Sequence, residues 1–267
     1  MISIKEYYPS TALAPFVDRY YRGIFNTSAE ANRSIKIVPN GCLELIIHLK
    51  ELYCKLPNGN KLSYTPDYML IGMFSRTYQV HFSEQVPVFS IRFKPQALPY
   101  ILRIKGSEVF ENYGDIESLL DKRFLNFCHR IREDQNIGTM IERTEKFLVQ
   151  ILAKQTLQES YVTKAVKLIY NSRMNHVHEL SEKVNISQRQ LERKFKELIG
   201  VSPKQYFKLI RINKAIELLR QNQSLNLTDI TYYCGYFDQA HFIKDFKQIT
   251  SQTPSSFIAE QQKSINF

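Results

Sequence analysis

The chain has 267 residues, 43% of them hydrophobic, and a formal net charge of +10 at pH 7, a length that fits one large or two ordinary domains. No stretch approaches the roughly 18 consecutive apolar residues of a membrane helix, and the first residues lack the apolar core of a signal peptide. Cys42, Cys54, Cys128 and Cys234 lack C-x-x-C spacing, so we expect reduced packing thiols in a cytoplasmic protein rather than a disulfide framework or a cysteine metal site.

Up to about Lys105 the sequence has the two-residue period of β-strands. Apolar residues alternate along Leu43–Leu49 and again along Phe89–Phe93. Pro57-Asn58-Gly59-Asn60 separates two such runs and predicts a hairpin turn. Many short strands without βαβ spacing predict an antiparallel barrel or jelly-roll-like domain.

From about residue 107 the pattern becomes helical. Asp115 is a candidate cap for a helix toward Arg132, and a second helix is expected to start at Thr139, where Glu142 completes a capping box. The apolar face of this second helix comprises Met140, Ile141, Phe147, Leu148, Ile151 and Leu152. The polar segment Ala153–Ser160 predicts a linker.

The remaining chain contains one pattern twice, in Leu180–Tyr206 and Ile230–Phe257. Matched positions are 50 residues apart in the first part of the pattern and 51 apart in the second part. One residue is therefore inserted in the turn of the second copy. An internal repeat of this length is a strong indication of fold, because chance rarely aligns so many structural positions.

Each copy is typical of a helix-turn-helix unit. Asn185 and Gly235 suit the left-handed conformation at a helix end, and Ser187 and Asp238 suit the cap of the next helix. The apolar stripes of the second helices are Leu191, Phe195 and Leu198 in one copy and Phe242, Phe246 and Ile249 in the other. Ser202-Pro203 and Thr253-Pro254 then open a further helix with proline at its first position.

A continuous helix is predicted between the two units, over Pro203–Gln221. Leu209, Ile212, Ile216 and Leu219 recur on one face. A helix of this size is about 28 Å long at 1.5 Å per residue. It can therefore hold two reading helices about one DNA turn apart, since successive major-groove faces are separated by roughly 34 Å.

Together these elements predict an α+β protein. Residues 1–157 form a β-rich domain, helical from about 107, and residues 158–267 form an all-α DNA-binding domain of two helix-turn-helix units. The net charge is +7 from Tyr161 onward and +3 before it. A basic C-terminal part is consistent with binding the phosphate backbone, in a manner that weakens with salt.

The region from about Tyr161 to Glu260 resembles the DNA-binding module of the AraC/XylS family of bacterial transcription regulators. The matching residues are Ser187, Leu191, Arg193, Phe195, Lys196, Gly200, Ser202, Pro203, Tyr206, Arg211, Ala215, Leu218, Leu219, Asp229, Ile230, Gly235, Tyr236, Asp238, His241, Phe242, Phe246, Lys247 and Pro254. The departures are His176, Ser181, Thr231, Ala240 and Ser251. The resemblance implies a sequence-specific regulator with an N-terminal sensing and dimerising domain.

The face opposite each apolar stripe is expected to enter the major groove. In the first unit it carries Gln188, Arg189, Glu192, Arg193 and Lys196, and in the second Gln239, Ala240, Ile243, Lys244 and Lys247. By resemblance, the family reads bases from the positions of Arg189, Glu192 and Arg193. The alternative is a solvated helix with pairs such as Glu192 and Lys196. Because the second face has fewer long donors, we expect it mainly to grip backbone.

Two hypotheses concern the N-terminal domain. In the first, it binds a small effector through Glu44, His48 and Arg92; in the alternative, these are ordinary strand residues satisfied by their neighbours. In the second, the Thr139–Leu152 helix pairs with its twin in a homodimer; in the alternative, its stripe packs on its own barrel.

The expected partners are double-stranded DNA, with RNA polymerase, an effector and a second copy of the chain as further candidates. We expect no enzyme, catalytic residue, cofactor or metal, because no phosphate loop or nucleophile elbow occurs. Two alternatives remain. One is an architectural DNA binder without sequence preference. The other is a cupin-like metal-binding domain with enzymatic activity that uses His48, His81 and Glu44. The closely spaced H-x-H of the cupin class is absent.

Overall fold

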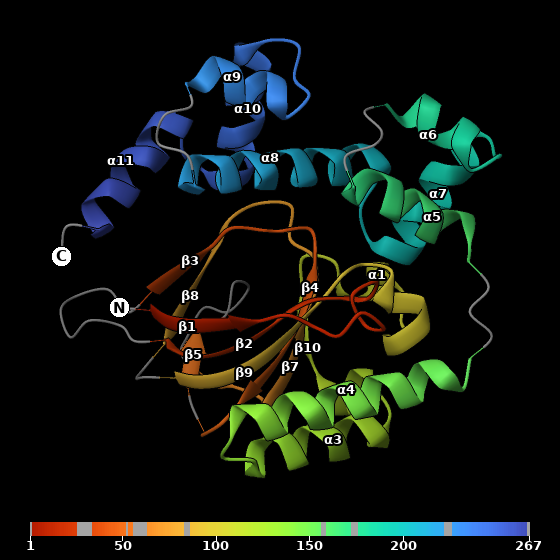
Figure 1. The fold of residues 1–267 in the computed structure, drawn as a ribbon, viewed down its shortest axis with the longest axis vertical. Helices are drawn as coiled ribbons and strands as arrows, with labels where there is room; N and C mark the ends of the chain where they lie inside the picture. Colours follow the sequence, from red (N-terminus) through yellow and green to blue (C-terminus); the bar gives the residue numbers. More distant parts are fainter. Residues whose placement is uncertain are drawn as a thin grey trace.

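The computed structural model describes residues 2–25, 34–51, 53–55, 63–82, 86–155, 159–171, 176–221 and 226–265. The N-terminal part contains two β-sheets, and the C-terminal part is helical (Figure 1). The strands are β1 (Ile2–Tyr7), β2 (Val17–Phe25), β3 (Ser34–Ile37), β4 (Leu43–His48), β5 (Tyr53–Lys55), β6 (Ser63–Tyr64), β7 (Tyr68–Ile71), β8 (Tyr78–Phe82), β9 (Val86–Phe93) and β10 (Tyr113–Asp115).

The strands pair antiparallel in two sheets, as the strand spacing predicted. One sheet has the order β1-β2-β9-β4-β7-β10 and the other the order β3-β8-β5-β6. The predicted hairpin at Pro57-Asn58-Gly59-Asn60 lies outside the described residues. The α+β fold class, with an antiparallel domain ahead of a helical one, is confirmed.

The alternation in β4 separates two environments. Leu43, Leu45 and Ile47 are buried in the hydrophobic core that the larger sheet shares with the helices. Glu44 lies on the opposite face and pairs in register with Arg92 of β9. Successive side chains of a strand point to opposite faces of the sheet. The alternation that buries the apolar residues therefore places Glu44 and Arg92 on the face that looks toward the second sheet.

The helices that follow the sheets are η1 (Leu98–Leu102, a short π-helical turn), α1 (Gly106–Val109), α2 (Ile116–Leu119), α3 (Lys122–Glu133) and α4 (Ile137–Ala153). Figure 1 shows α3 and α4 on the side of the sheets away from α8.

Two predicted helix starts are wrong. Asp115 caps only the four-residue α2, and the longer α3 begins after Asp121, whose carboxylate accepts from the backbone N–H groups of Arg123 and Phe124. Likewise α4 begins two residues before Thr139, because Asn136 accepts from the N–H of Gly138. In both cases a nearby Asp or Asn side chain provides the capping oxygen.

The C-terminal helices are α5 (Tyr161–Tyr170), α6 (Val177–Lys183), α7 (Gln188–Ile199), α8 (Pro203–Gln221), α9 (Leu227–Tyr233), α10 (Gln239–Thr250) and α11 (Pro254–Ile265). The bounds of α8 are those predicted for the connecting helix. It packs against α5 and α7 near one end and against α9 and α10 near the other. None of the helices in the described ranges is both long and apolar enough to cross a membrane.

The buried apolar residues form two clusters that do not follow the domain division we expected. The larger cluster runs from the β domain through α5 and the first helix-turn-helix unit to Tyr206 and Phe207. The smaller cluster joins the later part of α8, from Leu209, to α9, α10 and α11. The first unit therefore shares its core with the β domain, whereas the second has a core of its own.

Close backbone contact attaches the first unit to the β domain. A Cβ built on Gly106 would lie 2.2 Å from the carbonyl carbon of Ile199, and one built on Gly200 would lie 2.7 Å from the carbonyl oxygen of Gly106. Lys105 and Glu197 form an ion pair beside this contact, at 3.0 Å. Only glycine allows two backbone segments to approach so closely. The start of α1 and the end of α7 are therefore in direct contact.

Candidate nucleic-acid interface

The first helix-turn-helix unit consists of α6, a turn and α7. Asn185 adopts a φ of 57° in the turn, and the backbone N–H of Ile186 donates to the carbonyl of Ser181. The hydroxyl of Ser187 accepts from the N–H of Gln190 at 3.3 Å. His176, the departure at the start of α6, makes no side-chain cap. The turn thus has the predicted geometry.

The second unit repeats this arrangement with α9 and α10. Gly235 adopts a φ of 73°, and the N–H of Tyr236 donates to the carbonyl of Thr231. Asp238 caps α10 by accepting from the N–H of His241 at 2.7 Å. Ser251 takes the left-handed conformation, with a φ of 62°, at the end of α10, where Gly200 does so in the first unit. This departure from glycine places a non-glycine residue in a strained conformation.

The expected reading faces lie on the surface. The residues Gln188, Arg189, Glu192, Arg193, Lys196, Gln239, Ala240, Lys244 and Lys247 are exposed, and Ile243 is half-buried. Leu191, Phe195, Phe242, Phe246 and Ile249 are buried on the opposite faces, whereas Leu198 is half-buried and Ile199 is buried instead. Gln188 donates to Glu192 at 3.2 Å. Each unit therefore presents an exposed helix surface that carries cationic side chains.

The buried carboxylate of Asp245 holds α10 in place, a role that the sequence analysis did not predict. Asp245 accepts from the hydroxyl of Tyr236 at 3.3 Å and forms an ion pair with Lys208 of α8 at 2.7 Å. His241 lies 3.4 Å from the same carboxylate. The Asp245–Lys208 pair ties the second reading helix to α8, but its partners are 37 residues apart, so no local pattern could indicate it.

A cavity of about 870 Å³ lies between the two sheets and is closed on one side by α8. From the sheets it is lined by Tyr21, Glu44, Tyr78, Ser90 and Arg92, among others. From α8 it is lined by Ile210, Asn213, Lys214, Ile216, Glu217, Arg220 and Gln221. Small-molecule sites commonly have volumes of this order.

The structure brings together two of the three predicted effector residues. Glu44 accepts from the hydroxyl of Ser90 at 2.8 Å and pairs with Arg92 at 3.5 Å. The guanidinium of Arg92 lies over the ring of Tyr21, 4.3 Å from its centroid. His48 does not line this cavity; it is buried with Nδ1 2.9 Å from the carbonyl of Pro66, and burial lowers its pKa.

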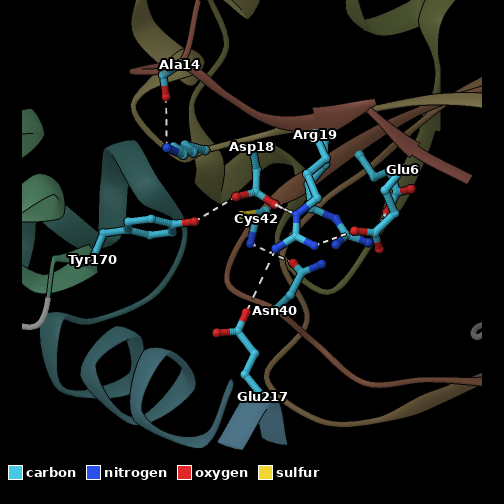
Figure 2. Close-up of polar contacts among 11 residues, drawn as sticks. Glu6, Ala14, Asp18, Arg19, Asn40, Cys42, Tyr170 and Glu217 are labelled. Atoms are coloured by element: carbon cyan, nitrogen blue, oxygen red, sulfur yellow. Dashed lines mark hydrogen bonds and ion pairs between the residues drawn. The ribbon is translucent and has the colours of Figure 1, made fainter. Parts of the chain in front are cut away.

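A polar network joins the rim of the cavity to the helical part (Figure 2). The hydroxyl of Tyr170 in α5 donates to Asp18 at 2.8 Å, and Arg19 pairs with Asp18 at 3.4 Å. Arg19 also contacts Glu6 of β1 at 2.5 Å and Glu217 of α8 at 3.9 Å. Asn213 of α8 donates to the carbonyl of Pro39 at 2.8 Å. These contacts hold α8 against the mouth of the cavity.

The apolar stripe of α4 is not free to pair with a second copy. Met140, Leu148, Ile151 and Leu152 are buried in the larger core, and the ring of Phe147 stacks on Phe127 of α3 at 4.4 Å between centroids. The structure therefore favours the alternative in which the stripe packs on its own domain.

Three of the four cysteines are buried free thiols, namely Cys42, Cys128 and Cys234. Burial raises the pKa of Cys42 to about 12 and that of Cys234 to about 11, which is the behaviour of packing thiols. Within the described ranges, no three His, Cys, Asp or Glu side chains are grouped to hold a metal ion.

Two parts of the chain match known families. Residues 180–260 match the family described as a helix-turn-helix domain, and residues 5–115 match a domain of unknown function, DUF6597. Two tandem helix-turn-helix units joined by one helix are typical of DNA-binding proteins that have two reading helices. Within that class, the helix-turn-helix part of the chain, residues 180–260, is of the AraC/XylS type.

Similar proteins include the HTH-type transcriptional activator RhaS of Escherichia coli O139:H28, 31% identical over 115 residues, and RhaS of Escherichia coli O157:H7, 30% identical over 115 residues. Each match covers 40% of this chain and only 41% of the relative.

Among solved structures, ToxT from Vibrio cholerae O395 has a TM-score of 0.48 and 14% identity, covering 90% of this chain and 96% of that chain. The DNA-binding domain of AdpA in complex with a target DNA has a TM-score of 0.37 and 18% identity, covering 40% and 96%.

Proposed function

We propose that the chain is a sequence-specific DNA-binding transcription regulator. The observation that carries the proposal is the pair of exposed helix faces with cationic side chains, on α7 and α10, near the two ends of one continuous 19-residue helix. As a regulator it would act beside RNA polymerase in the cytoplasm, where the DNA is. It would carry out no catalysis of its own.

Arg193 is the residue whose loss tests the first reading face most directly. Arginine can donate to both O6 and N7 of guanine, so Arg193→Ala should weaken specific binding by about 1–3 kcal/mol and relax the preference at one base pair. The measurement is selection of bound fragments from genomic DNA by the purified full-length chain, followed by titration of the selected site.

Lys194→Ala is the matched control, because Lys194 is on the same helix but half-buried, with its ammonium 2.9 Å from Glu197. It should keep the wild-type base preference. If the wild-type chain retained all fragments equally, the architectural alternative would replace the proposal.

We propose further that the cavity binds a small effector. Glu44 and Arg92 line it, and neither the hydroxyl of Tyr21 nor Nε of Arg92 has a hydrogen-bond partner among the described residues. Buried polar atoms are normally paired, so these two donors favour a ligand that carries hydrogen-bond acceptors. Because α8 closes the cavity, a ligand would contact the helix that spaces the reading faces, and so could couple binding to DNA affinity.

Tyr21→Phe tests the effector proposal by removing one buried hydroxyl. We expect the metabolite that most raises the thermal midpoint of the full-length chain also to change its affinity for the selected DNA. Tyr21→Phe should weaken binding of that metabolite about tenfold, the cost of one hydrogen bond.

Tyr20→Phe is the control, since Tyr20 directly precedes Tyr21 in β2 but does not line the cavity, and its hydroxyl donates to Glu145 at 3.3 Å. A stabilising metabolite that left DNA affinity unchanged would contradict the coupling. One that acted equally on the wild type and on Tyr21→Phe would contradict the site.

A further inference from the structure

The turn of the second helix-turn-helix unit contains one residue that the first unit lacks. Ile186 and Tyr236 are equivalent, because each donates its N–H to a carbonyl five residues earlier, on Ser181 and Thr231 respectively. In the first unit the helix cap, Ser187, follows at once. In the second unit Phe237 stands between Tyr236 and the cap Asp238. Phe237 is therefore the inserted residue.

Folding does not explain an aromatic ring at this position. Phe237 is 90% exposed, more than any other large hydrophobic residue in the described ranges, and it belongs to neither apolar cluster. Tyr232 and Tyr233, 64% and 62% exposed, precede it at the end of α9. The equivalent residues of the first unit are Glu182 and Lys183. Only the second unit exposes aromatic rings beside its turn.

The position of Phe237 makes DNA the occupant that the surface fits best. It directly precedes the cap of α10, and residues at the start of a recognition helix are the ones that reach base edges. Three and six residues further on are Ala240 and Ile243, and the exposed Lys244 and Lys247 lie on the same helix. An apolar strip that continues into a cationic face is suited to a groove lined by phosphates.

The strip differs in chemistry from the first reading face. At the positions of Ala240 and Ile243 the first unit carries Arg189 and Glu192, which can exchange hydrogen bonds with bases. Ala240, Ile243 and Phe237 cannot do so through their side chains. The apolar group that the major groove displays is the C5-methyl of thymine.

We propose that Phe237 is a DNA-contact residue, and that with Ala240 and Ile243 it makes the second unit select thymine through its methyl group. The inference rests on the proposed function and extends it. It also revises the expectation that the second unit mainly grips backbone, since apolar contact adds base selection without long donors.

Selection of bound duplexes from a randomised pool, with the full-length chain, tests the inference. The wild type should enrich thymine in the half-site of the second unit, and Phe237→Ser should lower that enrichment about fivefold, the lower end of single base-pair effects. The half-site of the first unit should not change. Phe237→Leu, which keeps an apolar side chain, should retain most of the enrichment.

Tyr232→Ser is the matched control, because it removes an exposed ring from α9, ahead of the turn, and should select the wild-type site. Circular dichroism of each variant checks the fold. Unchanged selection by Phe237→Ser would overturn the inference and leave the proposed function intact. If the wild type showed no base preference in either half-site, the proposed function would fail together with the inference.

Discussion

Replacing Phe246 with alanine is expected to lower the free energy of unfolding by about 3–5 kcal/mol, the usual cost of truncating a buried phenylalanine, and to abolish selective DNA binding. Phe246 is fully buried at the centre of the smaller core. Its ring contacts those of Phe242 and Phe257, at 5.7 and 5.6 Å between centroids. Without it, α10 loses the packing that holds its reading face in place.

Phe237→Ala is the control for this experiment, since it makes the same substitution in the same unit at an exposed position. Its effect on stability should stay within about 0.5 kcal/mol. Denaturant titration of both variants provides the comparison of stability, and titration with the selected DNA is carried out for Phe246→Ala against the wild type, because Phe237 is itself the proposed DNA contact. Similar stability losses in the two variants would show that the second unit is not organised around Phe246.

Gly106→Ala is expected to destabilise the protein by about 1–3 kcal/mol, the range for overpacking, despite adding only a methyl group. The new Cβ would lie 2.2 and 2.3 Å from the carbonyl carbon and oxygen of Ile199 and 2.6 Å from the nitrogen of Gly200. These are backbone atoms, which cannot swing away as a side chain can. Either α1 or the end of α7 must move, so the first unit should loosen from the β domain.

The matched control is Gly138→Ala, at the start of α4. There the nearest atom to a new Cβ is the side-chain oxygen of Asn136, at 3.0 Å, and alanine favours a helix over glycine by up to about 1 kcal/mol. We expect this variant to be as stable as the wild type or more so, in thermal melts monitored by circular dichroism. A Gly106→Ala protein that melted like Gly138→Ala would disprove the close contact.

The parts of the fold that the sequence predicted well are those fixed by local chemistry. The two turns were predictable because only certain residues tolerate a positive φ, and Asn185 and Gly235 stand where it is needed. The bounds of α8 followed from Pro203 and from one apolar face. The exposed faces of α7 and α10 followed from the buried stripes opposite them.

The parts that were missed depend on contacts between distant segments. Nothing near Asp18 in the sequence indicates Tyr170, 152 residues away. The role of α8 as a wall of the cavity could not be predicted either, because its helical period shows which face is apolar but not what covers it. His48 is four residues after Glu44, a spacing that places both on one face of a strand. However, β4 ends at His48, and the imidazole forms a hydrogen bond with the carbonyl of Pro66.

The unequal division of the apolar core has a consequence for the order of binding. The first unit shares its core with the β domain, whereas the second packs mainly on the far end of α8 and touches the β domain at Thr77, which donates to the carbonyl of Ile249 at 2.8 Å. Once one unit engages DNA, the other is presented to its half-site by a tether of fixed length. Its encounter then depends on an effective concentration set by the helix and not on the number of free molecules. Two individually weak contacts can in this way produce tight occupancy through avidity.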